Sequence, residues 1–250
     1  MKARLAAYGG AQLRDYLAGR ALVTVAATGV AAWAYGFMHG LTWSAFDASG
    51  GIDARNQLQR AFEFTLAAFA FIAAAFAAHG LVAKHRRRGY DLVLFSRPLS
   101  PVRYYAQGFV IAGLGAALLG AMAAEVYAVA VHPVSVIGTV AYVLLGWLTI
   151  GGLAFLLSTL TVFHVPLLVL LLAADLSLDR YVTGVRASGA GRPVLDVAQY
   201  LLPPGHVVAM LSGSFARGVV DARTVLWPIV FGVMCVVAAL LLLRRRPFGS

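Results

Sequence analysis

Long uncharged apolar runs recur along this chain, and they restrict its fold more than any other feature. The 49 residues 126–174 include no Asp, Glu, Lys or Arg, and similar runs begin near Ala21, Ala61 and Thr224. A helix needs about 20 apolar residues to cross the hydrocarbon layer of a bilayer. Because the runs are continuous instead of alternating, they predict transmembrane helices and not strands. We therefore expect an all-α membrane protein.

Composition supports the same fold class. Hydrophobic residues make up 61% of the chain and charged residues 12%, whereas a soluble domain is about 45–50% apolar and about 25% charged. A chain of 250 residues is too short to bury that excess in one core. The net charge of +10 does not indicate nucleic-acid binding, because the cations lie at the ends of the apolar runs.

Six spans are predicted within one transmembrane domain covering residues 21–250. Pro133 and Pro166 divide the longest run, since proline interrupts a helix. The spans lie at about residues 21–40, 61–83, 104–131, 136–160, 163–178 and 224–243. We expect residues 1–20 to form an interfacial helix. Between the fifth and sixth spans, an external helical hairpin is expected around the turn that begins at Pro203.

The distribution of Lys and Arg predicts the orientation of these spans. An even number of spans places both termini on one side, and cations are enriched in cytoplasmic segments. With the termini in the cytoplasm, thirteen of the 20 cations are inside: Lys2, Arg4, Arg14, Arg20, Lys84, Arg86, Arg87, Arg88, Arg97, Arg103, Arg244, Arg245 and Arg246. We expect a multi-pass protein of the cell inner (plasma) membrane with both termini in the cytoplasm.

Residues 84–105 form a basic cytoplasmic loop between the second and third spans. Gly89 can end the second helix, and Pro98 stops any helix that follows it. Ser100 and Pro101 suit the start of the next helix. The intervening residues are long enough for a short helix parallel to the membrane, which predicts a docking surface for a partner. The simpler alternative is a loop that only fixes topology. The predicted docking residues are Arg88, Gly89, Tyr90, Asp91, Val93, Leu94, Arg97 and Pro98.

This loop resembles the one found between the second and third spans of ABC-2 type transporter permeases, and most closely the branch associated with maturation of nitrous oxide reductase. The residues that carry the resemblance are Gly89, Asp91, Leu92, Leu94, Ser96, Arg97, Pro98, Leu99, Ser100, Arg103 and Tyr104. Family members often have acidic residues before this Gly, whereas residues 85–88 here are His-Arg-Arg-Arg. The layout of the whole chain is also similar to that of the family.

The resemblance implies a permease subunit of an ATP-binding cassette transporter, in which the loop helix is a coupling helix. It also implies that the protein is an exporter and that it pairs with a second copy or a related permease among membrane lipids. Two copies of a separate ATPase subunit would bind this pair. The chain itself has no phosphate-binding loop, because its only lysines, Lys2 and Lys84, do not follow a Gly-rich turn. ATP and Mg²⁺ are therefore expected in the partner. We expect no enzymatic activity here.

Glu125 and Asp175 are the charges most clearly inside predicted spans, and intramembrane carboxylates are candidates for function. They could line a pathway, or each could reach interfacial water. The histidines show no metal-ligand spacing, and no serine lies in a Gly-x-Ser-x-Gly motif. We therefore predict no catalytic, cofactor or metal site. Two alternatives to the permease remain: a non-transporting membrane scaffold or assembly subunit, and a proton-coupled secondary transporter using Glu125 and Asp175.

Overall fold

The computed structural model describes Gly10, Arg14 and residues 16–38, 52–79, 82, 100–130, 133–161, 163–184, 197 and 202–245. Regular structure in these ranges is helical, and no strand occurs in them. The elements are η1 (Tyr16–Ala21), α2 (Leu22–Met38), α4 (Ile52–His79), α7 (Pro101–Ala130), α8 (Val136–Gly146), η2 (Trp147–Gly151), α9 (Gly152–Leu160), α10 (His164–Gly184), α12 (Gly205–Ala216) and α13 (Ala222–Arg245). The all-α prediction is confirmed.

Four helical stretches are long and apolar enough to cross a bilayer: Asn56–Phe76, Pro101–Ala130, Val136–Leu160 and Ala222–Arg245. They correspond to the second, third, fourth and sixth predicted spans. The first and fifth predicted spans are also helical, but α2 has only 17 residues. The fifth, α10, contains three charged residues in its second half. The protein is therefore a membrane-embedded helical protein with four candidate spans among its described residues.

Several helices extend beyond the apolar run that predicted them. The second helix begins at Ile52 and not near residue 61, because Asn56, Gln57 and Arg60 continue it as exposed polar turns. Hydropathy marks only the part of a helix that is apolar, while polar residues such as Gln and Arg form helix readily. At the other end of the chain, Tyr16–Ala21 forms a π-helical turn that runs directly into α2. Most of the predicted interfacial helix at residues 1–20 lies outside the described residues.

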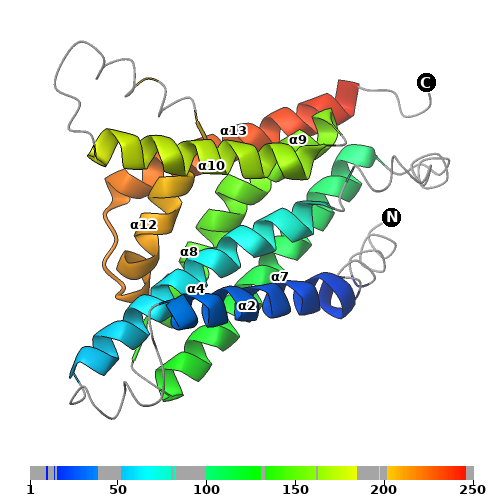
Figure 1. The fold of residues 1–250 in the computed structure, drawn as a ribbon. Helices are drawn as coiled ribbons and strands as arrows, with labels where there is room; N and C mark the ends of the chain where they lie inside the picture. The colour runs from blue at the N-terminus through cyan, green and yellow to red at the C-terminus, as the bar shows by residue number, and fades with distance from the viewer. Residues whose placement is uncertain are drawn as a thin grey trace.

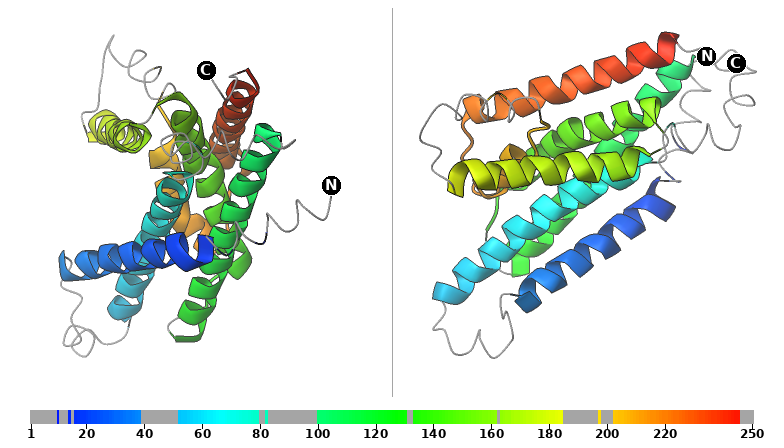
Figure 2. Two further views of the ribbon diagram at one scale, coloured as in Figure 1. Left: turned by 90° about the vertical axis from the view of Figure 1, so that its right-hand side faces the viewer. Right: turned by 45° about the horizontal axis from the view of Figure 1, so that its top comes forward.

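Successive long helices run in alternating directions (Figure 1). The starts of α2, α7 and α10 and the ends of α4, α9 and α13 lie at one end of the bundle, as the second view in Figure 2 also shows. We call this the basic end, because its described helix termini include Arg20, Arg103, Arg244 and Arg245. The ends of α2, α7 and α10 lie at the opposite end, together with α12. The chain thus passes back and forth between two ends of the bundle.

A central rod made of α8, η2 and α9 is the most deeply buried of the four candidate spans. It starts at Ser135, whose side chain accepts a hydrogen bond from the Gly138 backbone N–H at 3.0 Å. In the π-helical turn η2, the Thr149 hydroxyl lies 2.8 Å from the Leu145 carbonyl oxygen and 3.2 Å from that of Pro228 on α13. The rod and α13 therefore approach closely where both helices are irregular, the rod at its π-helical turn and α13 at Pro228.

Glycines allow this close approach. A Cβ added at Gly232 of α13 would lie 2.5 Å from the Leu148 carbonyl oxygen, and one added at Gly152 would lie 2.9 Å from the Gly232 carbonyl oxygen. Small residues at helix crossings permit such packing in membrane proteins. Because backbone atoms stand on both sides, a larger residue can be accommodated only if the two helices separate.

We expect Gly232→Ala to destabilise the protein by about 1–3 kcal/mol, since overpacking would force α13 away from the central rod. Gly29→Ala on α2 is the matched control, because a Cβ there meets nothing within 4 Å. In a helix interior that control substitution is expected to stabilise by about 0.5–1 kcal/mol. Denaturant unfolding in detergent micelles measures both variants, and equal changes at the two positions would contradict the close crossing.

Candidate functional site

The two carboxylates predicted inside spans lie in different surroundings. Asp175 on α10 is completely buried, with 0% of its surface exposed. Glu125 on α7 is exposed, and no hydrogen bond or ion pair joins its side chain to another described residue. The structure therefore does not bring the two predicted pathway residues together in one described contact. The predicted docking residues from Arg88 to Pro98 lie outside the described residues.

Asp175 is hydrogen-bonded twice to the start of α12. The His206 backbone N–H donates to Asp175 Oδ2 at 2.6 Å, and the His206 ring nitrogen Nδ1 lies 2.7 Å from Asp175 Oδ1. Because a carboxylate only accepts, Nδ1 carries the hydrogen in this contact. A carboxylate at a helix N-terminus is also favourably placed in the field of the helix dipole. Asp175 therefore fixes the first turn of α12 to the middle of α10.

The residues before His206 explain how a backbone N–H reaches a carboxylate on another helix. Pro203 and Pro204 are buried and cannot donate backbone hydrogen bonds, and the Val208 N–H turns back to the Pro204 carbonyl oxygen at 3.1 Å. Gly205 then allows close approach, because a Cβ there would lie 3.1 Å from Asp175 Oδ2 and 2.9 Å from Leu172 Cδ2. The predicted proline turn is thus the segment that presents His206 to α10.

A second carboxylate holds the other end of α12. Arg217 Nη1 donates to Glu63 Oε1 of α4 at 3.1 Å, and Gln59 Nε2 donates to the same oxygen at 3.0 Å. The Glu63 carboxylate also rests against Gly213, where an added Cβ would lie 2.7 Å away. The arginine side chain is 56% exposed and that of Glu63 is 22% exposed. Glu63 therefore joins α4 to the end of α12.

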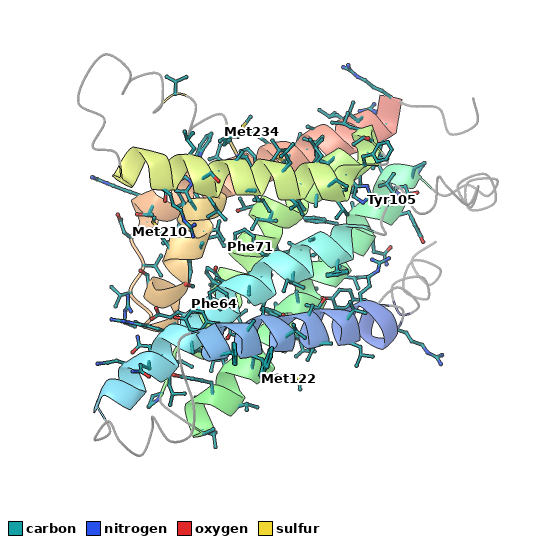
Figure 3. The ribbon with its side chains drawn as sticks, viewed as in Figure 1. Phe64, Phe71, Tyr105, Met122, Met210 and Met234 are labelled. Carbon is teal, nitrogen blue, oxygen red and sulfur yellow. The ribbon has the colours of Figure 1, made fainter. Side chains whose placement is uncertain are left out.

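Between its two fixed ends, α12 is packed against α4, α8 and α10. Val208 is fully buried, and the Phe215 ring lies 5.8 Å from that of Tyr142 on α8. The Ser135 N–H donates to the Ala216 carbonyl oxygen at 2.9 Å. Figure 3 shows Phe71 of α4 inside the bundle and Met210 on α12, with Met210 64% exposed. Only this second helix of the predicted external hairpin is described. It packs on the bundle and does not merely rest on the membrane surface.

Sequence reasoning identified Asp175 but missed its partner. His206 lies 31 residues away along the chain, and nothing in the local pattern links the two positions. The only sequence signal is that a turn of two prolines and a glycine directly precedes the histidine. Such a turn begins a helix at a defined position, but it does not specify which other helix its first N–H groups will face.

No group of three or more His, Cys, Asp or Glu side chains within the described ranges could hold a metal ion. The site is instead a set of charged contacts around a short helix: Asp175 with His206 at its start and Glu63 with Arg217 at its end. The His206 ring of this site can bind and release a proton. The two carboxylates attach α12 to α10 and to α4. Comparison of the chain with family models, with curated proteins and with solved structures gives no match.

Proposed function

We propose that this protein is the membrane-spanning permease subunit of an ATP-binding cassette transporter, an exporter driven by a separate ATPase. The observation that carries the proposal is the run of residues 89–104, which resembles the coupling loop of ABC-2 permeases. It connects α4 to α7, whose adjoining ends both lie at the basic end of the bundle (Figure 1). A loop there can meet a cytoplasmic partner if that end faces the cytoplasm.

The alternating directions of the helices support six membrane crossings in this proposal. The crossings are η1 with α2, then α4, α7, the rod α8–η2–α9, α10 and α13. Arg20, Arg103, Arg244 and Arg245 gather at the basic end. The opposite end includes Arg180, Arg217 and Arg223 together with the carboxylates of Asp179 and Asp221. Over the whole sequence, however, thirteen of the 20 cations fall on the side of the basic end. By the positive-inside rule, the basic end is cytoplasmic, so both termini are in the cytoplasm of a cell whose inner (plasma) membrane holds the protein.

The first turns of α7 offer a route from the loop to the bundle. A docked ATPase pair would push on residues 90–97, and α7 begins at Pro101 only a few residues later. Tyr105 is fully buried. Phe109 lies with its ring 4.9 Å from that of Trp147 and 5.4 Å from that of Phe155, both on the central rod. Movement of the loop would therefore reach the central rod through aromatic contacts and not through lipid.

Proton-coupled secondary transport is the second candidate, and the buried Asp175–His206 contact is the observation that favours it. Glu125→Gln and Asp175→Asn distinguish the two candidates. In an ATP-driven permease the variants that fold keep ATPase binding, whereas in a carrier that uses both carboxylates each substitution removes transport even from a folded variant. The exposed position of Glu125 is less suited to a shared proton path with Asp175.

Co-purification tests the proposal directly. The tagged protein is extracted from its native membranes in mild detergent, and the products of neighbouring genes are identified in the purified complex. We expect a subunit with a phosphate-binding loop, two copies of it for each pair of membrane subunits, and ATPase activity that depends on this chain. A complex that contains no nucleotide-hydrolysing subunit would instead favour the scaffold alternative.

A further inference from the structure

Asp175, His206 and Asp179 lie close together and differ in how far their side chains are exposed. Asp175 is 0% exposed and the His206 side chain is 12% exposed. Asp179, one helical turn further along α10, is partly exposed. A proton from water can thus reach His206 without entering the buried carboxylate first. An intramembrane carboxylate bound to a titratable side chain is a candidate for proton chemistry.

We propose that Asp175 and His206, with Asp179 beside them, form a proton-binding site, and that the proton it holds fixes the start of α12 to α10. The Nδ1–H of His206 donates to Asp175 in both states. The exchangeable proton bonds to Nε2, coming from water at the opposite end of the bundle and returning to it. Proton uptake changes the pair from a net charge of −1 to neutral. This inference is independent of ATP-driven transport.

Charge explains why the proton matters. A buried carboxylate facing a neutral ring keeps one unbalanced negative charge away from water, which is unfavourable. When the ring is an imidazolium, the ring hydrogen bond joins two opposite charges, and charge-assisted bonds of this kind are the stronger ones. Loss of the proton therefore weakens the attachment of the first turn of α12 without removing its ring hydrogen bond.

Other titratable and charged groups lie on the elements around α12. The helices that pack on α12 contribute Asp175, Asp179 and Arg180 from α10, Arg60 and Glu63 from α4, Tyr142 from α8, and Arg223 from α13. Glu63 is bonded to Arg217 at the far end of α12. An arginine stays protonated at all relevant pH values. The contact at the end of α12 should therefore persist while the contact at its start responds to pH.

The direction of the pH dependence follows from His206, which lies outside the four candidate spans. Its hydrogen bond to Asp175 is the main cause that raises its pKa above the ordinary 6.5; partial burial opposes this, and the charges of Asp175 and Asp179 add to it. His206 therefore holds its proton more tightly when α12 is attached to α10. The attachment is strongest below pH 6.5 and weakens as the pH rises through the raised pKa of the attached histidine.

Proton binding is tested by nuclear magnetic resonance on the full-length chain in nanodiscs, with ¹⁵N-labelled histidine. His206→Gln identifies the His206 signal among the 6 histidines. We expect its titration midpoint above 6.5, a clearly lower midpoint in Asp175→Asn, and a smaller decrease in Asp179→Asn. The Asp179 variant keeps the test readable should the Asp175 variant not fold. A wild-type midpoint at or below 6.5 would overturn the proposal.

Coupling to α12 is tested by hydrogen exchange, with protection factors corrected for the intrinsic effect of pH. Between about pH 6 and about pH 9, protection at the start of α12 should fall by up to about tenfold per pH unit over the titration range. Arg217→Gln is the matched control and should show the same fall, because it alters only the far end. Protection that stays constant while His206 titrates, or a fall that persists in His206→Gln, would refute the coupling.

Discussion

Asp175→Ala should destabilise the protein by about 2–6 kcal/mol, because it leaves two N–H groups of His206 without an acceptor, each at a cost of about 1–3 kcal/mol. The substitution takes the acceptor from both the His206 backbone N–H and its ring at once. It also removes the carboxylate that lies close to Gly205 because this residue has no Cβ. Denaturant unfolding in detergent micelles, followed by tryptophan fluorescence, measures the change.

Glu125→Ala is the matched control for that measurement. Both residues are carboxylates in apolar helices, but Glu125 is exposed and its side chain makes no hydrogen bond or ion pair with another described residue. We expect a change within about 0.5 kcal/mol, as for other surface substitutions. A double variant with His206→Ala should lose less than the sum of the two single changes, since residues that share a contact are not additive. Equal effects of the two single carboxylate substitutions would contradict the described packing.

Replacing Leu94 and Arg97 by Asp together should abolish association with the ATPase subunit and, with it, ATP-driven transport. In the proposed docking helix, Leu94 supplies apolar contact and Arg97 supplies positive charge on the same side. Two carboxylates there would remove the apolar area and reverse the charge. Co-purification of the ATPase with the tagged variant, followed by ATPase assay of the complex, gives the result.

The control carries the same two changes at the opposite end of the bundle. Val219→Asp and Arg223→Asp alter exposed residues near the start of α13, at the end opposite the basic loop. They add the same charges but should leave the ATPase bound. If the loop variant kept its partner, or if the control lost it to the same degree, residues 84–105 would not be the docking surface.

The sequence predicted the helical class and the position of each long helix, because apolar runs of sufficient length have few other stable structures in a membrane. It predicted the boundaries less well. The start of α4 at Ile52 could not be read from hydropathy, since exposed polar turns continue that helix beyond its apolar part. For α10, three charged residues lie in the second half of the helix, which is why its predicted end at residue 178 falls short of Gly184.

The candidate site was predictable only in part. A lone carboxylate in an apolar run singled out Asp175, because an unpaired charge is expensive inside a membrane. Its partner depends on how α12 folds back onto α10, and that tertiary arrangement brings together residues far apart in the chain. The same is true of Glu63 and Arg217, which are separated by 154 positions. Pairings of this kind follow from packing, and no local residue pattern encodes them.

The most direct test of the account is the side of the membrane on which each end of the bundle lies. In a background without Cys235, single variants Ser100→Cys and Val219→Cys place one thiol at each end, both at exposed positions. We predict that a membrane-impermeant maleimide labels the Val219→Cys variant in intact cells. It should label the Ser100→Cys variant only after the membrane is opened. Labelling of the Ser100→Cys variant from outside would place the basic loop away from any cytoplasmic ATPase and would contradict the account.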